Sequence, residues 1–190
     1  MTDIRKLWKE KIIPCKNCEI SNLTGNCDKA VWGGNEEPSD YFWIAQNPGY
    51  VDRNKTHDWD NDKLRRVFPI EGNNNKQQDE FTKFLFDKGI YQKSYFTNLI
   101  KCATLKNRAP DRDEIKKCFN FLLDELILIK PKKIITLGKV SREWIEFYQE
   151  KIKEILDNPL MIHYPHPTYV YSYNRSKKDE FENQVLKDLL

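Results

Sequence analysis

The sequence predicts an α/β fold with a parallel sheet that carries helices on both of its faces. Two observations predict it: short apolar runs alternate with longer segments of helical periodicity, and those segments are long enough to cross between parallel strands. With 190 residues, 39% of them hydrophobic, the chain can bury one sizeable core. We therefore expect a single domain over 1–190, in which 1–30 holds a helix and a CxxC segment.

Four short apolar segments are predicted to form the strands. The first, YFWIA at 41–45, is an uninterrupted apolar run bounded by a turn, which is typical of a strand buried on both faces. The others are YFTNLI at 95–100, KIITLG at 133–138 and LMIHY at 160–164. In such a sheet, ligands bind at the carboxyl ends of the strands.

Apolar residues at helical spacing predict five helices. The strongest begins after Pro110 and Asp111 and ends before Pro131, because proline cannot continue a helix. Its apolar stripe consists of Ile115, Cys118, Phe119, Leu122 and Leu126. The other helices are expected at 2–12, 76–88, 139–155 and 177–189.

Composition and charge exclude several classes of protein. The 32 basic and 29 acidic residues give a net charge of only +3, so a basic surface for a polyanion must be local. The mean hydropathy is −0.78, and no apolar run approaches the roughly 18 residues of a membrane span. The start, MTDIRKLWKEK, is charged and lacks the apolar region of a secretory signal. We expect a soluble, cytoplasmic protein with no membrane partner.

The residues that follow the four strands are the candidates for a site. They are 46–49, 101–102, 138–139 and 165–168, and a polar loop at 50–75 is long enough to be functional. Asn98 is notable because a buried amide needs partners or a ligand, although it could also be a satisfied core amide. Asn47, before Pro48 and Gly49, could belong to an ordinary turn, and His166 could be a loop histidine without a task.

The cysteines suggest a metal site. Five cysteines in a chain without an export signal argue against a disulfide framework. Cys15 and Cys18 form a CxxC, Cys102 lies just past a strand, and Cys118 lies about two turns into the next helix. Four thiolates suit either zinc or a [4Fe–4S] cluster. Alternatively, Cys118 only fills the apolar stripe of its helix.

Four sequence blocks carry a resemblance to a known family. They are PCKNC, YFWIAQNPGYVD, the segment YFTNLIKCATLKNRAPDRDEIKKC with the following KPKKIITLGKVSREWI, and HPTYVY. Together they resemble the uracil-DNA glycosylase superfamily, most closely its iron–sulfur (type-4) enzymes. The resemblance implies a three-layer α/β/α sandwich around a four-stranded parallel sheet. It also implies that the protein hydrolyses the N-glycosidic bond of uracil in DNA during base excision repair.

The same resemblance assigns the cysteines. By position, Cys15, Cys18, Cys102 and Cys118 would hold a structural [4Fe–4S] cluster, and Cys27 would lie outside the set. Zinc is the alternative occupant. We expect the cluster to clamp the N-terminal segment to the sheet and to perform no redox chemistry.

The resemblance also assigns roles around a uracil that has left the duplex. Phe68 would stack on the base, and Asn98 would bond its edge. His166, in HPT, would donate a hydrogen bond to uracil O2, and Asn47 would hold the attacking water. The set of substrate-binding residues is completed by Gln46 and Gly49.

The first motif departs from the type-4 pattern. Type-4 enzymes usually have GEAPG, whereas this chain has AQNPG, with Gln46 at the acidic position. In strict uracil enzymes a tyrosine after the proline blocks the thymine methyl group, and here that position is Gly49. This departure keeps open an inactive glycosylase-fold protein that binds or senses DNA damage. A zinc-stabilised α/β nucleotide hydrolase is a third, less favoured alternative.

Contacts with uracil-containing DNA are expected at the same edge of the sheet, from a protein that acts as a monomer. Basic residues there could pair with phosphates, and the helix start after Gly138 could add backbone N–H donors. Tyrosines after the HPT motif could wedge into the duplex or simply form a strand. The candidates are Lys101, Lys106, Arg108, Lys139 and Arg175 for phosphates, and Tyr169 and Tyr171 for the wedge.

Overall fold

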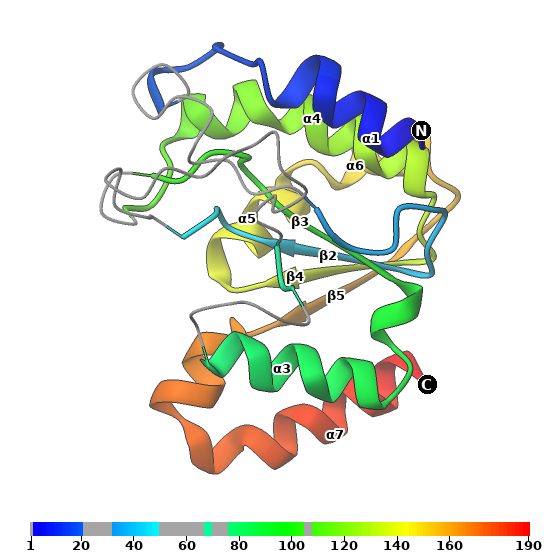
Figure 1. Ribbon diagram of the computed structural model, residues 1–190, viewed down its shortest axis with the longest axis vertical. Helices are drawn as coiled ribbons and strands as arrows, with labels where there is room; N and C mark the ends of the chain where they lie inside the picture. Colours follow the sequence, from blue (N-terminus) through cyan, green and yellow to red (C-terminus); the bar gives the residue numbers. More distant parts are fainter. Residues whose placement is uncertain (1, 21–31, 50–66, 70–75, 105–107) are drawn as a thin grey trace.

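The computed structural model describes residues 2–20, 32–49, 67–69, 76–104 and 108–190. Its centre is a five-stranded sheet with the strand order β1-β3-β2-β4-β5 (Figure 1). Strands β2 to β5 run parallel to their neighbours, and only β1 is antiparallel. The strands are β1 (Gly33–Gly34), β2 (Tyr41–Ala45), β3 (Ser94–Asn98), β4 (Lys133–Leu137) and β5 (Leu160–Tyr164).

The four predicted strands and their parallel pairing are confirmed, but the prediction missed β1. This strand consists of two glycines, which have no side chain to signal a strand. Glycine is required there because a Cβ on Gly33 would lie 1.7 Å from the carbonyl oxygen of Val67. Strand β1 therefore allows the backbone around Val67 to pack closely against the edge of the sheet.

One face of the sheet is covered by α1 (Asp3–Leu7), which continues as a π-helical segment (Trp8–Ile12), and by α4 (Arg112–Ile129). Asp111 and Glu114 form a capping box at the start of α4, as expected for a helix that begins after Pro110. The same layer contains α5 (Lys139–Phe147) and α6 (Gln149–Ile155). The predicted helix 139–155 is thus interrupted at Tyr148, whose ring stacks on that of Phe119 at 3.8 Å.

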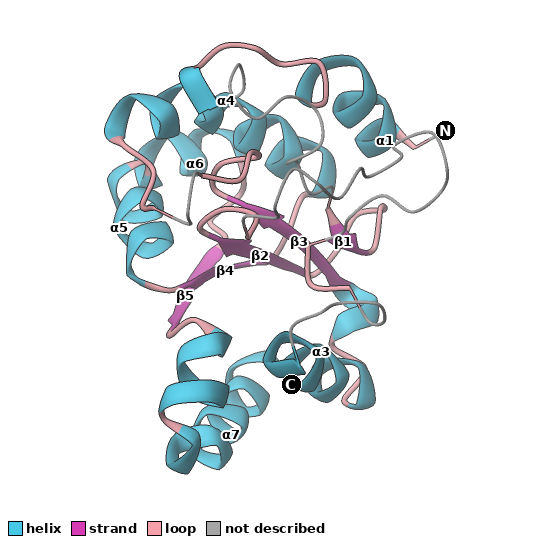
Figure 2. Cartoon of the chain, turned by 60° about the vertical axis from the view of Figure 1, so that its left-hand side comes forward, coloured by secondary structure: helices cyan, strands magenta, loops and turns pink. Residues whose placement is uncertain are grey.

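The other face is covered by α3 (Lys76–Asp87) and α7 (Lys178–Leu189) (Figure 2). Between β5 and α7 the chain forms a π-helical segment (Tyr169–Tyr173) and a 3₁₀ turn (Arg175–Lys177), and another 3₁₀ turn (Tyr91–Lys93) precedes β3. The two faces of the sheet have separate apolar cores, so the expected three layers are confirmed. None of the helices in the described part of the chain is long and apolar enough to span a membrane.

Candidate active site

The ends of β2 and β3 lie side by side, because Ala45 pairs with Asn98 in the parallel ladder. Two further hydrogen bonds extend the pairing beyond the strands. The N–H of Leu99 donates to the carbonyl of Ala45 at 2.7 Å, and that of Ile100 donates to the carbonyl of Gln46 at 3.1 Å. The loop that carries Asn47 therefore begins beside the last residue of β3.

Asn98 is a buried amide at the carboxyl edge of the sheet. It is 3% exposed, and strand alternation places it on the same face as Phe96, toward α3 and α7. Among the described residues, no hydrogen bond to its side-chain amide is found. An amide that is nearly buried and has no hydrogen bond to another described residue is available to bond a ligand.

Phe68 lies on this same face and connects β3 with the loop after β5. Its ring centroid is 5.6 Å from that of Phe96 and 6.3 Å from that of His166. Its carbonyl accepts a hydrogen bond from the hydroxyl of Tyr91 at 3.0 Å. The φ angle of Phe68 is +48°, a left-handed conformation that a bulky residue rarely adopts and that is often found at functional sites.

His166 follows β5 and contacts the helix start after β4. A Cβ on Gly138, whose φ is +93°, would lie 3.5 Å from the Cβ of His166. The backbone N–H of Thr168 donates to Nδ1 of His166 at 3.2 Å, so in the neutral ring the proton is on Nε2. Burial lowers the pKa of His166 to about 4. At neutral pH this side chain is therefore an uncharged hydrogen-bond donor.

Asn47 is held by hydrogen bonds from three sides. Its Oδ1 accepts from Nε2 of Gln46 at 2.7 Å, while its Nδ2 donates to the carbonyl of Pro48 at 2.8 Å and to the hydroxyl of Thr104 at 3.4 Å. The hydroxyl of Thr104 itself donates to the carbonyl of Arg108 at 2.6 Å. Sequence reasoning missed Thr104, since a single threonine in a loop carries no distinguishing signal.

The structure thus brings most of the predicted base-binding residues to one edge of the sheet. The ring of Phe68 lies beside those of His166 and of Phe96, which is on the same face of β3 as Asn98. Asn47 follows the end of β2, the strand next to β3. Gln46 contacts Asn47 directly, and Gly49 is exposed at the surface. Most of the predicted polar loop 50–75 lies outside the described residues.

All four cysteines predicted to act together line a single pocket, which also contacts Lys101. The backbone N–H of Lys101 donates to Sγ of Cys118 at 3.3 Å. Burial raises the pKa of Cys118 to about 11, and the neighbouring Cys15 and Cys18 add to this shift, whereas Lys101 opposes it. Within the described part of the chain, no group of three or more His, Cys, Asp or Glu side chains forms a metal-ion site. Cys27 lies outside the described residues.

Comparison with known proteins decides the family. Residues 34–190 match the family model of the uracil DNA glycosylase superfamily, which covers most of the chain. The chain belongs to this superfamily. The matched region includes the ends of β2, β3 and β5, so the predicted base-binding residues lie within it, whereas Cys15 and Cys18 precede it.

Curated relatives of this superfamily member carry the name type-4 uracil-DNA glycosylase. The protein from Sulfurisphaera tokodaii is 30% identical over 146 residues, which cover 76% of this chain and 59% of that protein. The one from Archaeoglobus fulgidus is 26% identical over 136 residues, covering 71% and 60%. The chain therefore spans about three fifths of the length of these relatives. The crystal structure of Pedobacter heparinus SMUG2 aligns with a TM-score of 0.48 at 12% identity, over 79% of this chain and 74% of that one.

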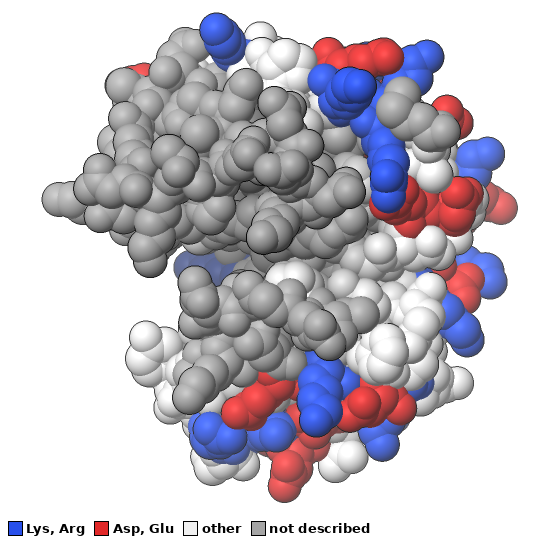
Figure 3. All heavy atoms as spheres, in the orientation of Figure 1, with Lys and Arg blue, Asp and Glu red and all other residues white. Residues whose placement is uncertain are grey.

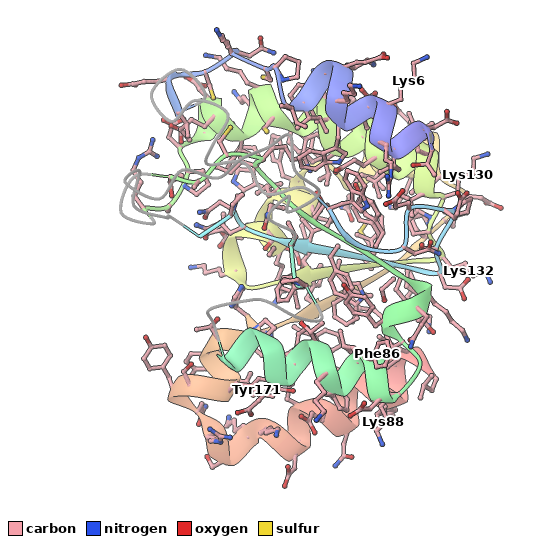
Figure 4. All side chains as sticks on the ribbon, viewed as in Figure 1. Lys6, Phe86, Lys88, Lys130, Lys132 and Tyr171 are labelled. Atoms are coloured by element: carbon pink, nitrogen blue, oxygen red, sulfur yellow. The ribbon has the colours of Figure 1, made fainter. Side chains whose placement is uncertain are left out.

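Two of the predicted DNA contacts are wrong. Lys101 is 1% exposed, and its Nζ lies in the core beside Glu125, so it cannot reach a phosphate. Tyr171 is also 1% exposed; it lies in the layer of α3 and α7 and donates its hydroxyl proton to Glu182 at 2.7 Å (Figure 4). The sequence predicts a DNA contact for both residues because their polar side chains lie next to a motif. In the folded protein both side chains are buried in the core.

The other predicted DNA contacts remain at the surface. Tyr169 is 53% exposed, and Lys139 is exposed within reach of Glu143 at 3.6 Å. Arg108 forms a bidentate ion pair with Glu114, and Nη2 of Arg175 donates to both carboxylate oxygens of Glu80 at 3.1 Å. Lys106 lies outside the described residues.

Charges on the viewed surface do not gather by sign. Figure 3 shows Lys and Arg side chains next to Asp and Glu side chains over most of the described part of this face. Lys130 and Lys132, labelled in Figure 4, lie between the end of α4 and the amino end of β4, whereas the candidate site is at the carboxyl ends of the strands. A basic surface for DNA therefore has to be local, as the small net charge predicts.

Proposed function

We propose that this protein removes uracil from DNA by hydrolysing the N-glycosidic bond. The observation that carries the proposal is a pair of complementary groups at the strand ends that surround Phe68. One is the neutral imidazole of His166, whose ring lies 6.3 Å from that of Phe68. The other is the amide of Asn98, two residues along β3 from Phe96, whose ring lies 5.6 Å from that of Phe68. Membership of the superfamily and the type-4 names of the relatives point to the same reaction.

Asn98 would select the base. Its carbonyl oxygen accepts from uracil N3–H, and its NH₂ group donates to uracil O4. Cytosine presents the opposite pattern at these two positions and would leave both groups of Asn98 unpaired. Because Asn98 is buried, unpaired groups there cost on the order of 1–3 kcal/mol each, which favours uracil.

His166 would stabilise the leaving group. Cleavage of the bond places negative charge on uracil O2, and the Nε2–H of His166 donates to that oxygen. The ring is neutral at this partly buried position, because desolvation lowers its pKa to about 4, and the neutral ring still carries the Nε2–H donor. Donors that are oriented before the reaction are typically worth about 3–4 kcal/mol each.

Asn47 would hold the water that attacks the sugar. An amide cannot accept a proton as a base, but its Oδ1 can accept a hydrogen bond from water. Gln46 and Thr104 fix the amide so that Oδ1 points away from Pro48 and Thr104. A weakly activated water is sufficient, because the sugar in the transition state already resembles an oxocarbenium ion.

We propose that the four-cysteine pocket holds a [4Fe–4S] cluster, for which thiolates are the usual ligands. Cys15 and Cys18 come from the N-terminal segment, whereas Cys102 and Cys118 come from the loop after β3 and from α4. Zinc held by four thiolates is the alternative occupant. When bound, the cluster would link the N-terminal segment to the sheet without taking part in the chemistry.

DNA would approach the carboxyl edge of the sheet, where Lys139 and Tyr169 are exposed. Arg108 and Arg175 could reach phosphates only by giving up part of their ion pairs with Glu114 and Glu80. We propose that the protein acts as a monomer inside the cell, where its DNA substrate is found.

An abasic-site assay tests the proposal. Single- and double-stranded oligonucleotides that contain uracil should be converted to abasic sites, and strands with thymine or hypoxanthine define the range of bases. Tight binding of uracil-containing DNA without cleavage would instead identify a damage-binding protein. Release of bases from free nucleosides but not from DNA would identify a nucleotide hydrolase.

A further inference from the structure

The core of the protein contains a buried ion pair that the proposed reaction does not use. Nζ of Lys101 lies 2.6 Å from Oε2 of Glu125, and the two residues are 1% and 0% exposed. Lys101 is in the loop after β3, and Glu125 is in α4. Removing two charges from water is costly, so a pair of this kind is weak evidence for stability and calls for another explanation.

The remaining hydrogen bonds of Lys101 go to the end of β3. Its Nζ donates to the carbonyl oxygen of Asn98 at 2.8 Å and to the hydroxyl of Thr97 at 2.7 Å. Lys101 thus holds the main chain of the residue whose side-chain amide faces the candidate base site. Since that amide has no hydrogen bond to another described residue, its position depends on the backbone that carries it.

Glu125 anchors this arrangement to two other elements. Its Oε1 accepts from the hydroxyl of Tyr95 at 2.8 Å and from Nε1 of Trp8 at 3.1 Å, and both of its carboxylate oxygens lie 3.1 Å from the hydroxyl of Thr97. The carboxylate is therefore held by β3 and by the N-terminal helical segment at the same time. A charged group with this many partners has one defined position in the core.

Lys101 also contacts the cysteine pocket through its main chain. Its backbone N–H donates to Sγ of Cys118, and the next residue is Cys102. The backbone of Lys101 is thus held by Cys118, and its side chain is held by Asn98 and Glu125. Lys101 therefore links the cysteine pocket to the main chain of Asn98.

We propose that Lys101 is a positioning residue for base selection, and that Glu125 is the counter-ion that keeps it in place. This inference deepens the proposed function and rests on it. It predicts that the ion pair contributes to the preference for uracil over cytosine more than to the stability of the fold.

The test uses the double variant Lys101→Met with Glu125→Gln, which removes both charges together and leaves no unpaired charge. The matched control is Lys133→Met. Lys133 is a partly buried lysine that donates to the carbonyl of Asp188 at 2.6 Å, from the amino end of β4. Cluster-loaded proteins are compared by their binding to non-cleavable strands that contain 2′-fluoro-2′-deoxyuridine or 2′-fluoro-2′-deoxycytidine.

We expect the double variant to keep its iron–sulfur absorbance and unfolding midpoint, and its uracil-to-cytosine binding ratio to fall at least tenfold. The control should retain the wild-type ratio. A folded double variant with an unchanged ratio overturns the proposal. If the double variant does not fold, Glu125→Gln alone is measured, and an unchanged ratio has the same consequence. A wild-type protein that shows no base preference overturns the proposed function, and with it this inference.

Discussion

The backbone N–H of Thr168 donates to Nδ1 of His166 at 3.2 Å, and this hydrogen bond determines which nitrogen of the ring carries the proton. Because Nδ1 accepts, the neutral ring has its proton on Nε2. Burial keeps the ring neutral by lowering its pKa to about 4. The backbone N–H of Thr168, two residues along the chain, therefore leaves Nε2–H as the hydrogen-bond donor of His166. No neighbouring carboxylate is needed to orient the ring.

Substitution of His166 tests the leaving-group donor. We expect His166→Ala to lower the single-turnover rate of uracil excision about 10²–10³-fold, the usual cost of losing one such donor. His163→Ala is the control, because the Nδ1 of His163 contacts Thr136 and its Nε2 lies near Glu146, away from the base site. Equal rates for the wild type and His166→Ala, both folded, would rule out this role.

The low pKa of His166 also predicts a pH-dependent stability. The folded pKa of about 4 lies below the value of about 6.5 for an unfolded histidine, so the unfolded state binds the proton first as the pH falls. The stability associated with the neutral ring is complete above about pH 6.5 and is lost as the pH falls toward about 4, by about 3 kcal/mol in total.

Urea unfolding measures this effect. The wild type should lose stability between about pH 6.5 and about pH 4 relative to His166→Gln, which cannot titrate in this range. Parallel stability curves for the two proteins would contradict the burial of a neutral imidazole at this position.

The orientation of Asn47 predicts different effects for two neighbouring substitutions. We expect Asn47→Ala to lower single-turnover excision about 10²-fold through loss of the positioned water, with little change in DNA binding. Thr104→Val, which removes one contact of the amide, should lower the rate by a smaller factor. Thr104→Ser keeps the hydroxyl and serves as the control. A Thr104→Ser rate that falls as far as that of Thr104→Val would assign Thr104 to packing instead.

The cysteine pocket predicts the composition of the bound group. Anaerobically prepared protein should contain about four irons and four sulfides per chain, and Cys118→Ser should lose the broad iron–sulfur absorbance together with thermal stability. Cys27→Ser is the control, because Cys27 lies outside the set of four cysteines. Zinc without iron in the anaerobic protein would contradict the assignment of a cluster.

Much of the fold could be predicted because its signals are local. The apolar run at 41–45 is long enough for one buried strand, and Asp111 with Glu114 marks the start of α4 by the hydrogen bonds that they form with each other. The break between α5 and α6 at Tyr148 has no such local signal. It coincides with the stacking of Tyr148 on Phe119, a residue of α4 that is distant in the sequence.

The candidate site divides in the same way. Asn47, Asn98 and His166 could be placed at one edge because the carboxyl ends of parallel strands must meet there. The roles of Lys101 and Tyr171 could not be predicted, since a side chain next to a motif can turn toward solvent or toward the core.

The sequence by itself determined the order of the four parallel strands and of the helices between them, the residues at the strand ends and the spacing of the four cysteines, because these depend on local pattern. It did not determine β1 or the break at Tyr148. Only the tertiary structure decided that Lys101 lies against Glu125 and that the imidazole of His166 is neutral. The physical reason is that burial, hydrogen-bond partners and pKa depend on neighbours far away in the chain, such as Glu125, which lies 24 residues after Lys101.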